Sequence, residues 1–228
     1  MHLPSLAKFY VLTLGHLFNS IGGNLKKIVL IGGGGLSSEV AEVATQNGFS
    51  VIGYVDACKT GSSLTYLGEP EVYFASKDKP DFVFPAFGAV DRKGLLMRSL
   101  SLKNLSGFTI PSLVSPHSYV SSSVTLGMGV FVSHGVVINP NTSVEDFSII
   151  NSGSIIGHNV TVSMCSIISG QVFIGGASNI GANTLIGPGV TIMHSIDIGS
   201  EVIVSIGSTV ARDIPDGKTT LPVMSKYV

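Results

Sequence analysis

Hydrophobic residues in the second half of the chain recur with a period of six. Starting at Val114, every sixth residue as far as Val210 is Val, Ile or Leu. The residue four places later is usually small or β-branched, as at Val130, Thr142 and Ser154. This period predicts a parallel β-helix, in which three short strands and three corners make one coil of about eighteen residues. The seventeen apolar positions are Val114, Val120, Leu126, Val132, Ile138, Val144, Ile150, Ile156, Val162, Ile168, Ile174, Ile180, Ile186, Ile192, Ile198, Val204 and Val210.

Stacking of such coils fixes where each residue lies. The periodic aliphatic side chains point inward, about 4.8 Å from their equivalents in the next coil. The range 114–210 is long enough for roughly five coils. Glycine often follows the inward aliphatic residue, and we interpret these glycines as corners whose backbone conformation other residues resist. They are Gly127, Gly157, Gly175, Gly181, Gly187 and Gly199.

The first half of the chain follows another pattern. An apolar run at 26–31, four glycines at 32–35, a segment with helical spacing at 36–48 and a second apolar run at 49–56 predict one strand–helix–strand unit. A further strand at 81–88 and a helix at 91–104 complete a small parallel sheet. We therefore predict an α/β, Rossmann-like domain at 26–110, a β-helix at 111–212 and a C-terminal tail at 213–228.

We interpret residues 1–25 as an extension to the first domain. Their apolar run, "FYVLTLGHLF" at 9–18, is about ten residues long, whereas a membrane-spanning helix needs about 20. Lys8 is the only charge before this run, and the small-residue cleavage site of a signal peptide does not follow it. We expect no membrane association from it.

Composition narrows the functional classes. The formal net charge is −1, which gives no electrostatic reason to expect nucleic acid or an anionic membrane as a partner. The two cysteines, Cys58 and Cys165, lie far apart and form no Cys-x-x-Cys pair. They indicate neither a disulfide framework nor a zinc knuckle, so we expect two reduced thiols and no metal.

The coil arithmetic gives the histidines different positions. His158 lies two residues after Ile156, at an outward corner, with Pro140 one coil below and Gly176 one coil above. His194 lies on the same corner two coils up, about 10 Å away, and His134 lies on another corner. A neutral imidazole can accept a proton near pH 7, and a glycine N–H above it could bind an oxyanion. These are the two parts that acyl transfer needs, although a corner histidine can also be simply a solvated side chain.

Several stretches together resemble one enzyme family. They are "IVLIGGGG", "GYVD", "VVINPNTSVEDFSIINSGSIIGHNV", "VFIGGASNIGANTLIGPGVTI" and "ARDIPDG". Over residues 26–228 the chain resembles the hexapeptide-repeat sugar O- and N-acetyltransferases, which include sialic acid O-acetyltransferases and nucleotide-aminosugar N-acetyltransferases. The resemblance implies a left-handed β-helix, a homotrimer, acetyl-CoA as co-substrate between adjacent prisms, and a sugar or nucleotide-sugar acceptor. It also implies a role in bacterial surface-polysaccharide synthesis in the cytoplasm, and it leaves O- and N-acetylation open.

The resemblance also assigns roles to residues. His158 matches the general base, Gly176 the glycine whose N–H polarises the thioester carbonyl, and Asn151 an asparagine lining the same pocket. Ile206 and Gly207 fall in the coil that contacts CoA. The acceptor-binding residues would be Gly32, Gly33, Gly34, Gly35, Asp56 and Asn151.

The chain departs from the family pattern at four places. Asn159 stands where an acidic residue usually follows the histidine. Leu36 and Ser37 replace a histidine-containing glycine turn, and Ala57 replaces a second acid after Asp56. The tail reads "TTLPVMSK" in place of a Gly-x-Pro-Ala segment.

Other functions remain open on the residues alone. Gly32, Gly34 and Asp56 could belong to a dinucleotide site, although Ser37 stands at the third glycine of that motif; the helix start at 36–38 could instead face a phosphate or sugar, or the glycines could be purely structural. A γ-type carbonic anhydrase-like zinc hydrase would use His158 and His194, but no third ligand is evident. A non-catalytic binding or scaffold prism is the remaining alternative.

Overall fold

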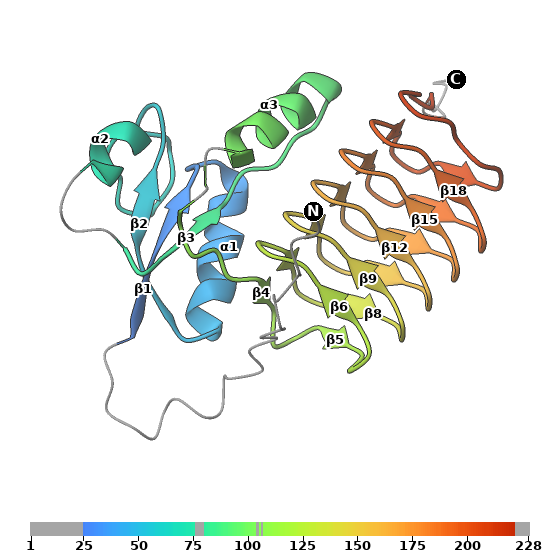
Figure 1. Cartoon of the computed structure of the whole chain (residues 1–228), viewed down its shortest axis with the longest axis horizontal. Coiled ribbons are helices and arrows are strands. Elements are labelled where there is room, and N and C mark those ends of the chain that lie inside the picture. The colour runs from blue at the N-terminus through green and yellow to red at the C-terminus, as the bar shows by residue number, and fades with distance from the viewer. Residues whose placement is uncertain (1–24, 76–79, 104, 106, 222–228) are drawn as a thin grey trace, which may run out of the picture.

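A small α/β domain lies against one side of a long β-helical prism (Figure 1). The computed structural model describes residues 25–75, 80–103, 105 and 107–221. Most of the predicted N-terminal extension and the last part of the predicted tail lie outside these residues. The predicted fold class, a Rossmann-like domain followed by a left-handed parallel β-helix, is confirmed.

The first domain is built on a three-stranded parallel sheet with the strand order β2-β1-β3. The predicted strands and helices are present, because their apolar residues form the buried side of each element. A short helix, α2, was not predicted, and it begins with proline at a position that tolerates the missing N–H. The elements are β1 (Lys26–Ile31), α1 (Gly35–Gln46), β2 (Phe49–Val55), α2 (Pro70–Phe74), β3 (Phe82–Pro85) and α3 (Arg92–Lys103).

The prism has three faces, each a parallel sheet of two-residue strands. The covered face consists of β4 (Leu113–Val114), β7 (Phe131–Val132), β10 (Ile149–Ile150), β13 (Ile167–Ile168), β16 (Leu185–Ile186) and β19 (Ile203–Val204). The apolar face consists of β5 (Tyr119–Val120), β8 (Val137–Ile138), β11 (Ile155–Ile156), β14 (Phe173–Ile174), β17 (Thr191–Ile192) and β20 (Thr209–Val210). The polar face consists of β6 (Thr125–Leu126), β9 (Ser143–Val144), β12 (Thr161–Val162), β15 (Asn179–Ile180) and β18 (Asp197–Ile198).

The second residue of every strand is a periodic aliphatic, and together these residues form the prism core. Paired strands are eighteen residues apart, as Ile150 with Ile168 and Ile156 with Ile174. The predicted coil length is therefore confirmed. Alternation along each strand sends its first residue outward, and that residue gives each face its character.

The outward residues explain how the two domains fit together. On the covered face they are large and apolar, and they share one buried cluster with the first domain. Phe131, for example, packs edge-on against Phe84 of β3 at a centroid distance of 6.3 Å. On the polar face they are Thr, Ser, Asn and Asp and face solvent. The sequence therefore assigns one face to the first domain and another to water.

The glycines after the inward aliphatics are required for a reason other than the predicted one. The left-handed backbone conformation lies two residues further on, at Asn159 after Gly157 and at Ala177 after Gly175, for example, with φ near 60°. The glycines themselves lie against the next coil: a Cβ at Gly157 would be 2.5 Å from the Gly176 nitrogen, and one at Gly175 would be 2.4 Å from the His194 nitrogen. They are needed for close approach of adjacent coils rather than for an unusual φ.

A buried arginine fastens helix α3 to the prism. Arg98 is 2% exposed and donates to the carbonyl oxygens of Phe87 (3.2 Å), Phe147 (2.5 Å) and Cys165 (3.4 Å). Burial lowers its pKa to about 10, so it remains charged at neutral pH. Three carbonyl dipoles satisfy this charge. Arg98 therefore couples the loop after β3 to two adjacent coils.

A second arginine holds the start of α3 to the far end of the prism. The Arg92 guanidinium donates to the Gly217 carbonyl oxygen at 2.8 Å and to the Thr219 hydroxyl at 3.3 Å. The helix is thus anchored at its start and near its middle to coils that lie far apart in the sequence.

Candidate functional site

His158 lies directly beneath Gly176 at the corner between the apolar and polar faces. The Ala177 N–H donates to the His158 carbonyl oxygen at 2.8 Å, which sets the two corners one coil apart. A Cβ added at Gly176 would lie 2.6 Å from His158 Nε2. The imidazole therefore occupies the space that any side chain at position 176 would need.

Asn159 holds the imidazole in place. Its Oδ1 lies 2.9 Å from His158 Nδ1. An amide oxygen only accepts hydrogen bonds, so Nδ1 carries the proton and Nε2 keeps a free lone pair. The amide at 159 can therefore orient the ring, at the position where the family pattern has an acidic residue. Its left-handed backbone, with φ 58°, suits asparagine better than most other residues.

The Gly176 N–H is free within the part of the chain that the structure describes. The corner hydrogen bonds on either side of it use the Gly175 and Ala177 N–H groups, and Gly176 itself only accepts, from the Ser195 N–H at 2.9 Å. A free backbone donor and a free imidazole nitrogen thus share one exposed corner. This pair can bind a developing oxyanion and accept a proton.

The other residues predicted for the site lie at a different corner of the same chain. Asn151, Ile206 and Gly207 follow strands of the covered face, so they lie between the covered and apolar faces. Residues share a corner only when they are about eighteen apart, and 151 and 158 are seven apart. One chain therefore places Asn151 and His158 at opposite edges of the apolar face and does not bring them together.

Asn151 instead lines a cleft of about 720 Å³ between the two domains. The first domain contributes the start of α1 and the segment from Gly88 to Gly94, and the prism contributes the corner of Asn151. This cleft lies where β1 and β3 end, the edge at which parallel α/β sheets bind ligands. Its lining is Leu36, Glu39, Gly88, Ala89, Val90, Asp91, Gly94, Ile149, Asn151, Ser152, Ile167, Ser169, Gly170 and Pro188.

Comparison with known proteins identifies the class. Residues 27–100 match the PglD N-terminal domain family. A His-to-Asn variant of perosamine N-acetyltransferase from Caulobacter crescentus, solved with CoA and GDP-perosamine, is similar with a TM-score of 0.76 and 28% identity, over 83% of this chain and 90% of that one. The acetyltransferase domain of PglB from Neisseria gonorrhoeae, solved with acetyl coenzyme A, gives a TM-score of 0.76 and 25% identity, over 86% and 95%. This chain is an acetyltransferase that is similar to the hexapeptide-repeat sugar acetyltransferases.

The fold of the acetyltransferase recurs in a more distant protein. WeeI from Acinetobacter baumannii gives a TM-score of 0.74 at 21% identity, over 85% of this chain and 95% of that one. Among curated protein sequences none matches. The family resemblance stated from the sequence is confirmed, and the CoA ligands of the similar structures agree with the predicted co-substrate.

The glycine turn of the acetyltransferase is largely engaged in holding the first domain together. The Gly33 N–H donates to Asp56 Oδ2 at 2.9 Å, and a Cβ at Gly33 would lie 2.2 Å from the Tyr54 ring. Gly32 has φ 101°, so it needs glycine for conformation. Gly32, Gly33 and Asp56 are therefore placed as structural residues, whereas Gly34 and Gly35 are exposed at the start of α1. None of the five lines the interdomain cleft.

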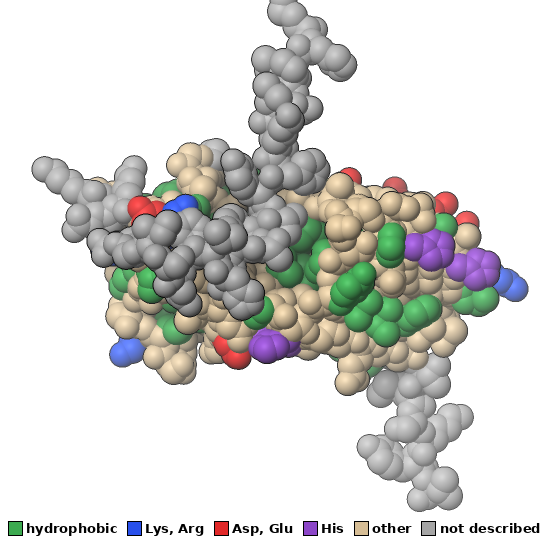
Figure 2. Space-filling model, turned by 90° about the horizontal axis from the view of Figure 1, so that it is seen from below, with side chains coloured by type: hydrophobic (Ala, Val, Ile, Leu, Met, Phe, Trp, Pro, Cys, Tyr) green, Lys and Arg blue, Asp and Glu red, His purple; other side chains and the backbone are tan. Residues whose placement is uncertain are grey.

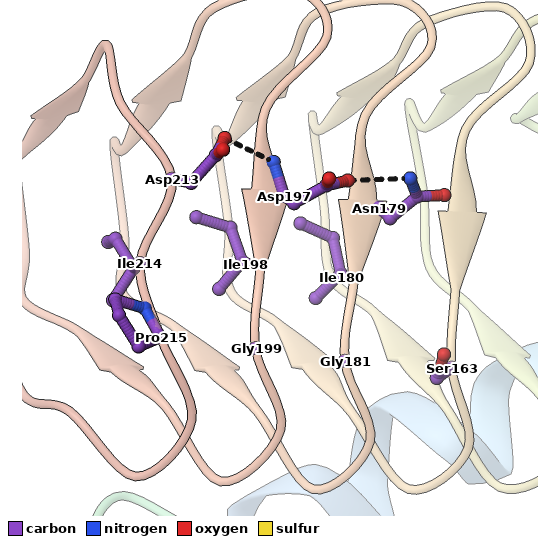
Figure 3. Close-up of a pocket in the computed structure, with 10 residues that line it drawn as sticks. All are labelled: Ser163, Asn179, Ile180, Gly181, Asp197, Ile198, Gly199, Asp213, Ile214 and Pro215. Atoms are coloured by element: carbon purple, nitrogen blue, oxygen red, sulfur yellow. Dashed lines mark hydrogen bonds between the residues drawn. The ribbon is translucent and has the colours of Figure 1, made fainter.

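The polar face carries a separate shallow groove of about 380 Å³ (Figure 3). Its polar groups are bonded to each other: Asn179 Nδ2 donates to Asp197 Oδ1 at 2.7 Å, and the Asp197 N–H donates to Asp213 Oδ1 at 2.9 Å. Of the described residues that line it, none is a histidine. The groove therefore lacks an imidazole beside a free glycine N–H, and we do not assign the reaction to it.

Metal chemistry finds no support in the described residues. No group of three or more His, Cys, Asp or Glu side chains there could hold a metal ion. His194 lies on the corner of His158, two coils away, and no third ligand joins them. Cys58 is exposed, Cys165 is buried, and neither forms a disulfide.

Among the residues that the structure describes, no helix is long and apolar enough to cross a membrane.

Three functional candidates escaped the sequence reasoning. Glu39 and Asp91 line the cleft, and Arg98 supports its wall. In the sequence, Glu39 lies on the exposed side of an ordinary amphipathic helix, and Asp91 is interpreted as a helix cap. The structure confirms the cap, because Asp91 Oδ1 accepts a hydrogen bond from the Gly94 N–H at 2.7 Å. Only the docking of the two domains distinguishes these residues from other surface charges.

Proposed function

We propose that the protein transfers the acetyl group of acetyl-CoA to an amino or hydroxyl group of a sugar by direct attack. The observation that carries this proposal is the free His158 Nε2 beneath the free Gly176 N–H. No enzyme nucleophile is needed, because the acceptor itself can attack the thioester. The CoA and sugar-nucleotide ligands of the similar acetyltransferases support this assignment.

In the proposed step His158 is the general base. The acceptor nitrogen or oxygen attacks the thioester carbon while its proton passes to Nε2. The carbonyl oxygen becomes an oxyanion, and the Gly176 N–H donates to it. The C–S bond then breaks, and the proton passes from the imidazolium to the CoA thiolate. Asn159 keeps the Nδ1 proton in place throughout.

We propose that the active sites form between chains of a homotrimer. The apolar face supports this, because four of its six outward residues are hydrophobic, and three of these are largely uncovered in one chain: Tyr119 is 60% exposed, Ile155 41% and Phe173 44%. Figure 2 shows hydrophobic side chains on this side of the prism, with histidines near its edges. Packing of such faces around a threefold axis buries them. It would also bring His158 of one chain toward Asn151, Ile206 and Gly207 of the next, with acetyl-CoA in the groove between.

The biological setting is also a proposal. Sugar acetylation with acetyl-CoA suits surface-polysaccharide synthesis in a bacterial cytoplasm. The two unpaired thiols, Cys58 and Cys165, support a reducing compartment.

The experiment is a coupled measurement of products. The protein is incubated with acetyl-CoA and a panel of aminosugars and hydroxyl acceptors, free and nucleotide-linked. We expect the amount of released CoA thiol to increase in step with one acetylated acceptor, whose mass rises by about 42 Da, the mass of an added acetyl group. Thiol release without any acetylated sugar, or no release with any acceptor, would reject the proposed function. Light scattering of the full chain tests the trimer separately, and Phe173→Glu is expected to dissociate it.

A further inference from the structure

The interdomain cleft has an electrostatic character that bears on its ligand. Two of its lining residues, Glu39 and Asp91, are acids. Of the described residues, no Lys, Arg or His lines the cleft. Glu39 has no hydrogen-bond or ion-pair partner there, and one oxygen of Asp91 is left after the other caps α3. The cleft therefore presents about two uncompensated negative charges.

The two arginines of α3, Arg92 and Arg98, form no contact with these acids. The Arg92 guanidinium extends away to Gly217 and Thr219, and all the donating nitrogens of Arg98 face carbonyl oxygens. The start of α1 contributes the positive end of a helix dipole, equivalent to about half a charge. Half a positive charge does not offset two carboxylates, so the cleft stays negative.

The neutral groups of the cleft suit a sugar. The Asn151 side-chain amide and the Ser169 hydroxyl have no partner in the described chain, and Ser152 Oγ is bonded to Ser133 Oγ at 2.8 Å. Free amides and hydroxyls bind sugar hydroxyls, and carboxylates bind hydroxyl or ammonium groups. A diphosphate brings further negative charge and is repelled by both acids.

We propose that this cleft binds the acceptor as a sugar without phosphate groups, and that Glu39 and Asp91 select against a nucleoside diphosphate. This inference rests on the proposed function for the identity of the cleft as the acceptor site. It separates this chain from the Caulobacter crescentus enzyme, whose structure holds GDP-perosamine.

The test uses GDP as a probe and needs no turnover. GDP binding is measured by calorimetry at low ionic strength, where surface charges are least screened, for the wild type and for Glu39→Gln/Asp91→Asn. Asn at 91 can still cap α3 through its side-chain oxygen. The control, Glu71→Gln/Glu201→Gln, removes the same charge from two exposed sites away from the cleft.

We expect the cleft variant to bind GDP at least about 10-fold more tightly than the wild type, a change of about 1.4 kcal/mol, and the control variant to differ by less than about 2-fold. Equal GDP affinity in the wild type and the cleft variant overturns the proposal, as does an equal gain in the control.

A second measurement compares acceptors. With methyl perosaminide and GDP-perosamine at equal concentration, wild-type kcat/KM is expected to favour the phosphate-free sugar, and Glu39→Gln/Asp91→Asn to narrow the preference. A wild-type preference for GDP-perosamine overturns the inference while leaving the proposed acetyl transfer intact. Absence of turnover with both sugars counts against the proposed function, and the GDP measurement then decides the inference alone.

Discussion

His134 and His158 occupy the same place in the hexapeptide, two residues after an inward aliphatic, but at different corners of the prism. His134 Nδ1 lies 2.7 Å from the Ser115 hydroxyl, and its Nε2 lies 3.7 Å from a Glu42 carboxylate oxygen on α1. Among the described residues, the His158 ring forms a hydrogen bond only with the amide of Asn159, and its Nε2 faces the backbone of Gly176. One imidazole is part of the domain interface, and the other is left with a free nitrogen at an exposed corner.

The difference shows that position in a repeat does not determine chemistry. Both imidazole rings point outward, because each histidine lies two residues after an inward aliphatic residue. What lies one coil above and on the neighbouring element then decides the role: a glycine leaves room for substrate atoms near His158, whereas α1 covers His134. A histidine on a solenoid should therefore be judged by its neighbour eighteen residues later as much as by its own position.

The largest effect should come from removing the free imidazole. His158→Ala is expected to lower kcat by about 100-fold or more, because the general base is lost, with acetyl-CoA binding retained. His194→Ala, on the same corner two coils away, should stay within about 2-fold, and so should His134→Ala if the protein remains folded. Initial rates of thiol release measure this. A similar fall in kcat for His134→Ala and His158→Ala would show that the two histidines do not differ in their importance for the reaction.

The next effect tests the glycine above the ring. A methyl group at 176 would meet His158 Nε2 at 2.6 Å, so Gly176→Ala must displace the imidazole or the amide. We expect kcat to fall about 10- to 100-fold, less than the roughly 100- to 1,000-fold that follows outright removal of an oxyanion donor. Ala177→Gly, one residue further along the same corner, relieves a φ of 60° and should leave kcat unchanged. Unaltered turnover in Gly176→Ala would show that this close contact is irrelevant to the reaction.

A smaller effect is expected from the orienting amide. Asn159→Ala removes the acceptor of the Nδ1 proton, and we expect kcat to fall about 5- to 10-fold as the ring samples unproductive orientations. Asn159→Asp keeps an oxygen acceptor and tolerates the left-handed backbone, so it should restore most of the rate. If kcat falls equally in Asn159→Ala and Asn159→Asp, the Asn159 side chain does not act through this hydrogen bond.

The smallest effect belongs to the His134 corner. Glu42→Gln should change the free energy of unfolding by about 0.5 kcal/mol or less, because Glu42 is 63% exposed and its separation from His134 is long for an ion pair. Denaturant titration measures it. A loss above about 2 kcal/mol would mean that the interface depends on this pair.

The prism was predictable because its period is long, uniform and made of residues whose burial is obligatory. Few folds other than a β-helix can bury seventeen aliphatic residues spaced six apart. The coil length of eighteen residues then predicts that Gly176 lies above His158. The glycines at 157 and 175 were predicted for the wrong reason, since a period in the sequence does not distinguish an unusual φ from a close approach of two coils.

The cleft and its acids could not be predicted, because they depend on how two domains dock. Nothing local marks Arg98 as the residue that fixes this docking: in the sequence it is one more cation on a helix. Its three carbonyl partners belong to a loop of the first domain and to two coils, and they come together only in the folded chain. The same holds for Glu42 and His134, whose contact joins α1 to the prism.

The bond between Arg92 and Gly217 spans 125 residues of sequence, and this has a consequence for biosynthesis. At about 5–20 residues per second, a ribosome needs roughly 6–25 s to add that length. Helix α3 therefore emerges long before its final anchor is translated, and its docking is completed only when the last coil closes.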